Sequence, residues 1–105
     1  QLDIADKDNG QMPKRFTVYQ NYPNPFNPVT SFRYDLFSNS EVRVAIYNTR
    51  GQMVKELFNG WQAAGQQSLS WDATGSMNQA VSAGIYFYVV ETNTTRQMRK
   101  MILLK

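Results

Sequence analysis

The sequence predicts an all-β fold, a Greek-key β-sandwich of about seven short strands. Three observations favour it. Apolar and polar residues alternate through most of the chain, and turn signals recur about every ten residues. β-branched and aromatic residues dominate the alternating segments, which argues against helices. With 105 residues, 42% of them hydrophobic, the chain is long enough for one domain with a modest core.

Seven segments have a strand pattern. In residues 30–36 the apolar Phe32, Tyr34 and Leu36 alternate with polar residues, whereas residues 85–92 are apolar on both faces, which predicts a central strand. The expected strands are RFTVY (15–19), TSFRYDL (30–36), EVRVAIYN (41–48), MVKELF (53–58), QSLSWDA (67–73), IYFYVVET (85–92) and TTRQMRKMILLK (94–105). The expected core includes Phe32, Val44, Ile46, Leu69, Trp71 and Phe87.

Turn signals separate these strands. NTRGQ (48–52) predicts a hairpin in which Gly51 takes a positive φ. Asn59-Gly60 predicts a second turn, which starts a loop through NGWQAAG and leaves Trp61 as the aromatic residue most exposed to solvent. In SAGIYFY we expect Tyr86 to form the tyrosine corner of immunoglobulin-like domains, by hydrogen bonding to upstream backbone.

The segment NYPNPFNP (21–28) is unusually rigid. Each of its three prolines fixes φ and removes a backbone donor, so the segment is neither a helix nor a central strand. We expect a stiff crossing that follows the first strand and switches sheets at one end of the sandwich, with Tyr22 and Phe26 as apolar anchors. Its structural motif comprises Asn24, Pro25, Phe26, Asn27 and Pro28.

Residues 1–15 are predominantly polar and predict a leader or linker from an upstream domain, with the folded domain at 16–105. No apolar run approaches the ~20 residues that cross a bilayer, so we expect no membrane span. No signal-peptide pattern opens the sequence either, and an export signal would belong to a longer precursor.

The composition argues against catalysis. Histidine and cysteine are both absent, which removes the usual base of hydrolase triads and the preferred transition-metal ligands. The eight acidic residues are scattered. We therefore expect no enzyme activity, catalytic residue, metal or cofactor. Asp72 with Asn78 is an alternative Ca²⁺ pair, but in the motif Trp71-Asp72 a carboxylate that closes a turn is the commoner arrangement.

Positive charge is concentrated at the C-terminal end. The last ten residues hold four bases and no acid, whereas residues 1–95 hold seven bases and eight acids. Such a basic strand is either a solvated, protected edge or a docking surface. Nucleic-acid binding would need a broader basic patch with accessible aromatic residues, so we expect none. An apolar strand at a sheet edge could also pair with a neighbour, which leaves a strand-mediated dimer open.

Five motifs in residues 19–105 together resemble a known family. They are YQNYPNPFNPVTSFRYDL, VAIYNTRGQMVKELF, AAGQQSLSWDATG, SAGIYFYVV and RKMILLK. In this order and spacing they resemble the type A C-terminal sorting domain of the type IX secretion system. They are also similar to the immunoglobulin-like domain of flagellar hook-capping proteins, which shares NPFNP, WD and GIY.

The first resemblance implies a non-catalytic sorting signal that takes a larger secreted bacterial protein through the periplasm and outer membrane to the cell surface or medium. The implied partners are the outer-membrane translocation machinery, a shuttle protein, a sortase-like protease and an N-terminal cargo domain. Cleavage would fall before the domain, around residues 8–11. The implied docking residues are a Gly-x-Tyr element and a basic terminal strand, here Gly84, Tyr86, Arg99, Lys100, Met101, Leu103, Leu104 and Lys105.

Two alternatives remain. A carbohydrate-binding accessory module of an extracellular enzyme would use the exposed Trp61 as a stacking platform. A scaffold domain of the hook-capping kind would have a purely structural role.

Overall fold

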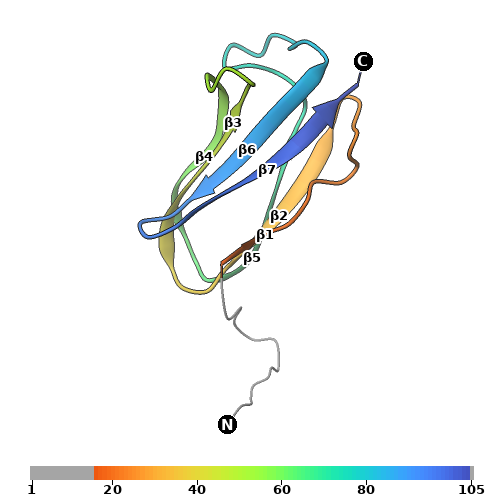
Figure 1. Cartoon of the computed structure of the whole chain (residues 1–105). Helices are drawn as coiled ribbons and strands as arrows, with labels where there is room; N and C mark the ends of the chain where they lie inside the picture. Colours follow the sequence, from red (N-terminus) through yellow and green to blue (C-terminus); the bar gives the residue numbers. More distant parts are fainter. Residues whose placement is uncertain (1–15, 105) are drawn as a thin grey trace.

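The computed structural model describes residues 16–104 as seven antiparallel strands in two sheets (Figure 1). The strands confirm the predicted all-β, immunoglobulin-like sandwich. Their bounds are β1 Thr17–Val18, β2 Thr30–Leu36, β3 Ser40–Tyr47, β4 Met53–Gln62, β5 Gly65–Trp71, β6 Gly84–Glu91 and β7 Arg96–Leu103.

The two sheets divide the strands unequally. One sheet has the order β1-β2-β5 and the other has the order β4-β3-β6-β7. Strand β6 therefore lies between two neighbours, which confirms the central strand predicted from its two apolar faces. The hairpin between β3 and β4 is also as predicted, because Gly51 has a φ of 81°.

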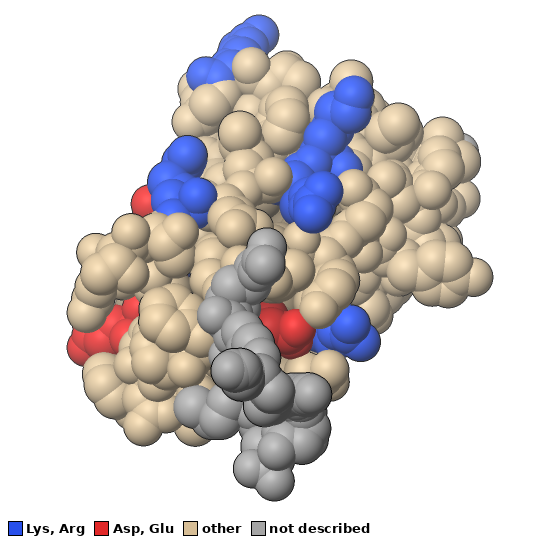
Figure 2. All heavy atoms as spheres, turned by 60° about the horizontal axis from the view of Figure 1, so that its bottom comes forward, with Lys and Arg blue, Asp and Glu red and all other residues tan. Residues whose placement is uncertain are grey.

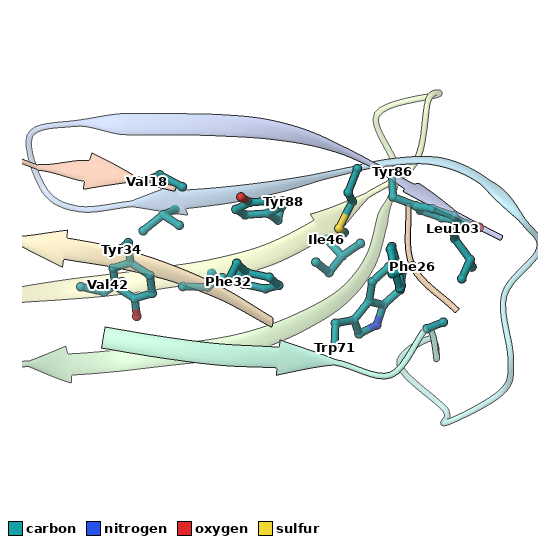
Figure 3. Packing of buried hydrophobic residues seen from close by; sticks show 14 of the residues in the cluster. Val18, Phe26, Phe32, Tyr34, Val42, Ile46, Trp71, Tyr86, Tyr88 and Leu103 are labelled. Carbon is teal, nitrogen blue, oxygen red and sulfur yellow. The ribbon is translucent and has the colours of Figure 1, made fainter. Parts of the chain in front are cut away.

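The core fills the space between the sheets and contains residues from every strand except β4 (Figure 3). Trp71 is 1% exposed, and its ring packs edge-on against Tyr86 at 5.3 Å and near Phe26 at 5.9 Å between ring centroids. Phe32 stacks on Tyr88 at 4.3 Å. Such aromatic pairs add to the hydrophobic stabilisation that comes from burial.

Two expected core residues lie elsewhere. Phe87 is half-buried on the outer face of its sheet, because alternation along β6 directs Tyr86, Tyr88 and Val90 inward instead. Leu69 points toward the core but stays half-buried, because its strand β5 is at a sheet edge.

The predicted turn at Asn59-Gly60 is wrong. Strand β4 continues through both residues, which lie opposite Arg43 and Val42 of β3. Trp61 is 64% exposed, as expected, but it belongs to this strand rather than to a loop. The chain turns only after Gln62.

The proline-rich crossing differs from its prediction in two ways. It joins β1 to β2 within one sheet, so it does not switch sheets. Phe26 is buried as expected, but Tyr22 is 82% exposed and anchors nothing in the core. The crossing nevertheless reaches the other sheet: Phe26 donates to the Ile102 carbonyl at 3.0 Å and accepts from the Leu104 amide at 2.8 Å. Figure 1 shows this loop beside the end of β7.

Candidate docking surface

Antiparallel pairing of β6 with β7 brings most of the predicted docking residues together. Gly84 lies opposite Leu103, and Tyr86 lies opposite Met101. Phe87 faces Lys100 in the same ladder. Lys105 and the expected cleavage region at residues 8–11 are outside the described residues.

Three of these residues are buried and support the fold. Tyr86, Met101 and Leu103 all belong to the core. The Tyr86 hydroxyl donates to the Ser82 carbonyl at 2.7 Å, which is the predicted tyrosine corner, and burial raises the pKa of Tyr86. Gly84 has a φ of 148°, which residues with a side chain rarely adopt. A partner would meet the shape that these residues create rather than their side chains.

Arg99 is a structural tie between the sheets. Its Nε donates to the Val18 carbonyl at 2.9 Å, while the residue remains exposed at the surface. The neighbouring Gln97 bonds to the same short strand through the Phe16 carbonyl and the Val18 amide, both at 3.3 Å. Side chains of β7 thus replace a main-chain ladder to β1.

The outer edge of β7 is covered further along as well. Gln20 donates to the Lys100 carbonyl at 2.8 Å, and the Ile102 amide donates to Oδ1 of Asn24 at 3.0 Å. Together with the Phe26 contacts, these bonds occupy the Lys100 carbonyl, both main-chain groups of Ile102 and the Leu104 amide, which an incoming strand would need there. Pairing with a neighbour through the terminal strand, one of the options the sequence left open, therefore has no free edge at this position.

The outer face of the same two strands is open. We call Ile85, Phe87, Met98, Lys100 and Ile102 the β6–β7 outer surface. Ile85 pairs with Ile102, and Phe87 with Lys100, so these side chains share one face of the sheet. Ile85 is 41% exposed and Met98 is 53% exposed, and within residues 16–104 no second layer covers them. Leu104, one of the implied docking residues, is 50% exposed beyond the strand end.

Sequence reasoning missed the apolar members of this surface. The available signal was that residues 85–92 are apolar on both faces, whereas only one face of an outer sheet is needed for a sandwich core. A shallow hollow of about 250 Å³ lies at its side, between Phe87, Met98 and the β3–β4 turn at Gly51.

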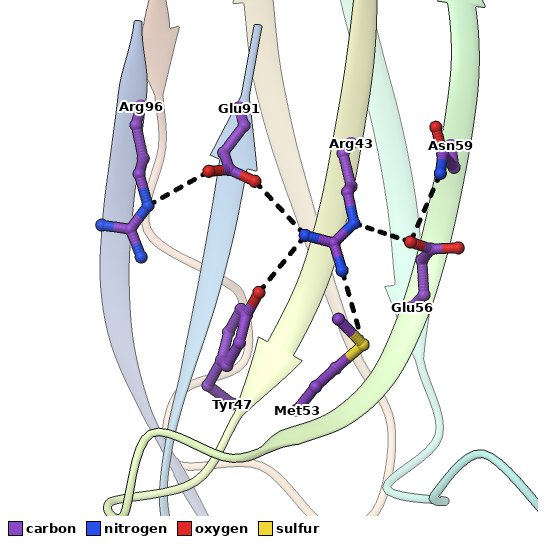
Figure 4. A network of polar contacts seen from close by, with 7 residues as sticks. All are labelled: Arg43, Tyr47, Met53, Glu56, Asn59, Glu91 and Arg96. Carbon is purple, nitrogen blue, oxygen red and sulfur yellow. Dashed lines mark hydrogen bonds and ion pairs between the residues drawn. The ribbon is translucent and has the colours of Figure 1, made fainter.

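A polar network borders this surface (Figure 4). The Arg43 Nε lies 2.7 Å from a carboxylate oxygen of Glu56, and its Nη1 lies 3.5 Å from Glu91. Glu91 also contacts the Arg96 Nε at 3.3 Å, so Arg96 is paired. The hydrogen bond that the Arg43 guanidinium donates to the Glu56 carboxylate is the main cause that raises the pKa of Arg43. Across the described part of the chain no ion pair involves Lys100, which is exposed.

Basic side chains are dispersed rather than continuous on the face shown in Figure 2. Lys and Arg form separate patches there, divided by uncharged residues. This differs from the broad basic stripe that typifies nucleic-acid binding.

Asp72 takes part in closing a loop. Thr74 Oγ1 donates to its Oδ1 at 2.6 Å, and this bond is the main cause that lowers the pKa of Asp72. The Trp71 indole donates to the Thr74 carbonyl at 2.9 Å, while the Lys55 ammonium lies 3.3 Å from Oδ1 of Asn78. A lysine at this oxygen disfavours the alternative Ca²⁺ site. Residues 16–104 contain no group of three His, Cys, Asp or Glu side chains that could hold a metal ion.

Residues 16–104 contain no helix with the length and apolar character to cross a membrane.

Solved structures with a similar fold include PorU and PorZ on one side and FlgD on the other. Dimeric latent PorU from Porphyromonas gingivalis matches 83% of this chain with a TM-score of 0.65 at 23% identity. PorZ of the same organism matches 84% with a TM-score of 0.58 at 19% identity. FlgD from P. aeruginosa matches 70% with a TM-score of 0.56 at 26% identity.

The chain corresponds to a small part of the first two proteins, 9% of the PorU chain and 11% of the PorZ chain, and to 57% of the FlgD chain. No curated protein matches the sequence. The family described as the FlgD Ig-like domain matches residues 28–96. Because this match spans more than half of the 105 residues, the chain belongs to the FlgD Ig-like domain family.

Proposed function

We propose that this domain is a non-catalytic sorting module that directs a larger bacterial protein across the outer membrane through the type IX secretion system. The five motifs of residues 19–105 support the proposal. The fold similarity to parts of PorU and PorZ also agrees with it, because PorZ is described as an essential surface component of that system.

The observation that carries the proposal is the β6–β7 outer surface. It combines exposed Ile85 and Met98 with Lys100, which forms no ion pair within residues 16–104, on the last two strands. Exposed apolar residues around a charge are typical of a protein-binding surface. A translocation machine that accepts many cargo proteins needs such a surface on the shared module rather than on the cargo.

The proposed partners are the translocation machinery, a shuttle protein and a sortase-like protease that acts before the domain. The cargo would be N-terminal to residue 16. The proposed destination is the cell surface or the medium, reached through the periplasm.

A fusion experiment tests this function. Residues 16–105 are joined to a periplasmic reporter and expressed in a host with the type IX machinery. We expect the reporter at the cell surface or in the medium, while the reporter without the domain stays in the periplasm. Retention of the fusion in the periplasm of a competent host would refute the proposal.

Substitutions on this fusion locate the docking surface. Lys100→Gln, alone and with Lys105→Gln, should reduce export while the melting temperature stays nearly unchanged, because exposed charges add little to stability. Arg50→Gln removes one positive charge from the exposed β3–β4 turn and serves as the matched control. Normal export of the Lys100 variants would restrict recognition to the fold and the apolar residues.

A second candidate function rests on Trp61. Its ring is 64% exposed on β4, opposite Glu41, and an exposed tryptophan can stack on a sugar. Carbohydrate binding would change tryptophan fluorescence during titration with polysaccharides, and Trp61→Ala would abolish the change. The unchanged fluorescence that we expect would argue against this candidate.

A hook-capping scaffold is the third option, and the family membership favours it. The sequence upstream of this domain separates it from sorting. A secreted catalytic or adhesive domain there supports sorting, whereas a flagellar scaffold supports the third option.

A further inference from the structure

The edge of β5 differs from the other long sheet edges of this domain. Strand β5 pairs with β2 on one side and has no strand on its other side. By contrast, the outer edge of β7 is covered by the β1 segment and the proline-rich crossing. The outer edge of β4 contains Lys55 and Glu56, and its pairing with β3 is interrupted by two register shifts. Charges and bulges of this kind protect an edge against pairing.

Hydrogen bonds on the far side of β2 reveal which groups of β5 are free. Ser31 exchanges both of its main-chain bonds with Tyr22, at 2.8 and 3.0 Å, and the Arg33 carbonyl accepts from Tyr19 at 2.9 Å. These groups therefore point away from β5. In an antiparallel ladder, the residues opposite them, Ser70 and Ser68, also point away from β2.

The same alternation includes Gln66, which faces Asp35. Gln66, Ser68 and Ser70 thus direct their amide and carbonyl groups at the free edge. Their side chains are exposed, and no side chain of residues 16–104 bonds to these main-chain groups. Because unpaired edge groups bind an added strand readily, this row is a template for strand addition.

The burial of apolar residues on the two flanks of the sandwich also favours strand addition at β5. On the flank of β1 and β7 the core-facing apolar residues are buried, with Val18 and Met101 at 0% exposure. On the flank of β4 and β5, Leu57, Phe58 and Leu69 pack on the core but remain half-buried. An added strand beside β5 would cover Leu69, so the flank has apolar area to gain from a partner.

The lack of charged residues on β5 suits pairing with an identical strand. No charged residue occurs from Ala63 to Trp71. In a two-fold dimer identical residues lie near each other, so a charged edge strand would be repelled by its own copy. Strand β5 has no charge and meets no such repulsion. We propose that β5 pairs antiparallel with β5 of a second copy of this chain, about a two-fold axis at Ser68.

In this arrangement Ser68 exchanges both main-chain bonds with Ser68 of the other copy. Gln66 pairs with Ser70 on either side of the axis. The two β1-β2-β5 sheets become one continuous sheet, and the β6–β7 outer surface stays free because it belongs to the other sheet.

Sedimentation equilibrium of the full chain tests the dimer. Between about 1 µM and about 1 mM, the average mass should rise from one chain to two. Ser68→Lys places like charges across the axis and should weaken association about tenfold or more. Thr94→Lys adds the same charge in the exposed β6–β7 turn and should leave association unchanged. A urea unfolding curve for Ser68→Lys that matches wild type shows that the monomer remains folded.

Hydrogen exchange identifies the edge involved. The amides of residues 66, 68 and 70 should become protected at high concentration, and the amides of the β4 edge should not. A chain that stays monomeric throughout, a dimer that resists Ser68→Lys, or protection on β4 instead of β5 would each overturn the proposal.

Discussion

Arg99 and Val18 are 81 residues apart in the sequence, yet the Arg99 guanidinium donates a 2.9 Å hydrogen bond to the Val18 carbonyl. This bond attaches the two-residue strand β1 to the last strand of the other sheet. It also divides the basic end of the chain into two kinds of residue. Arg99 and Arg96 are engaged within the domain, while Lys100 faces solvent.

The first prediction separates these roles by stability. Arg99→Ala should lower the free energy of unfolding by about 1–3 kcal/mol, because a partly buried carbonyl loses its donor. Lys100→Ala on the same strand should change it by less than about 0.5 kcal/mol. Urea denaturation of both variants measures the difference, and equal effects would contradict the assignment of Arg99 as a structural tie.

The second prediction concerns the tyrosine corner. Tyr86→Phe keeps the ring against Trp71 but removes the bond to the Ser82 carbonyl, and it should cost about 0.5–1.5 kcal/mol of stability. Tyr22→Phe is the matched control, because Tyr22 is 82% exposed and should tolerate the change. Thermal unfolding of both variants measures the difference in stability. A neutral Tyr86→Phe would mean that ring packing alone holds this corner.

The third prediction uses the two tryptophans. Trp71→Ala should cost about 3–5 kcal/mol, because a 1% exposed aromatic side chain leaves a cavity among Phe26 and Tyr86. Trp61→Ala should have little effect on unfolding, since that ring is mostly in solvent. Chemical denaturation followed by circular dichroism reports both without depending on tryptophan fluorescence. A mild effect at Trp71 would contradict the packing described above.

The fourth prediction is a loss of stability at alkaline pH. Burial raises the pKa of Tyr34 and of Tyr88 from 10.0 to about 12 in the folded domain. Because each phenol ionises more easily in the unfolded chain, their contribution is complete below about pH 10 and is lost as pH rises toward about 12.

Denaturant midpoints measured from neutral to alkaline pH should therefore decline over that interval. Tyr34→Phe should make the decline shallower, since the substituted ring has no proton to lose. A midpoint that stays constant above the ordinary pKa of tyrosine would contradict these shifts.

Local patterns were sufficient for most strands. Alternation predicted β2 and β3 closely, because the side-chain period of a strand is recorded in consecutive residues, and the run of apolar residues at 85–92 predicted β6. The turn prediction at Asn59-Gly60 failed because pairing with Arg43 and Val42 of the distant strand β3 overrode the local turn preference.

Solvent exposure was harder to predict. Phe87 and Tyr86 are adjacent aromatic residues in a segment with two apolar faces, so the sequence did not indicate which face meets the core. Tyr22 and Phe26 posed the same problem in the crossing, where packing against Trp71 and the end of β7 buries Phe26 and leaves Tyr22 exposed.

The sequence by itself determined the all-β class, the number of strands, the hairpin at Gly51 and the tyrosine corner at Tyr86, because each depends on residues close together in the chain. The tertiary structure alone decided that Arg99 is bound to Val18, that the β7 edge is closed and that the β5 edge is open. Those features depend on which strands become neighbours after folding. Strand order is set by packing between distant segments, and no local pattern encodes it.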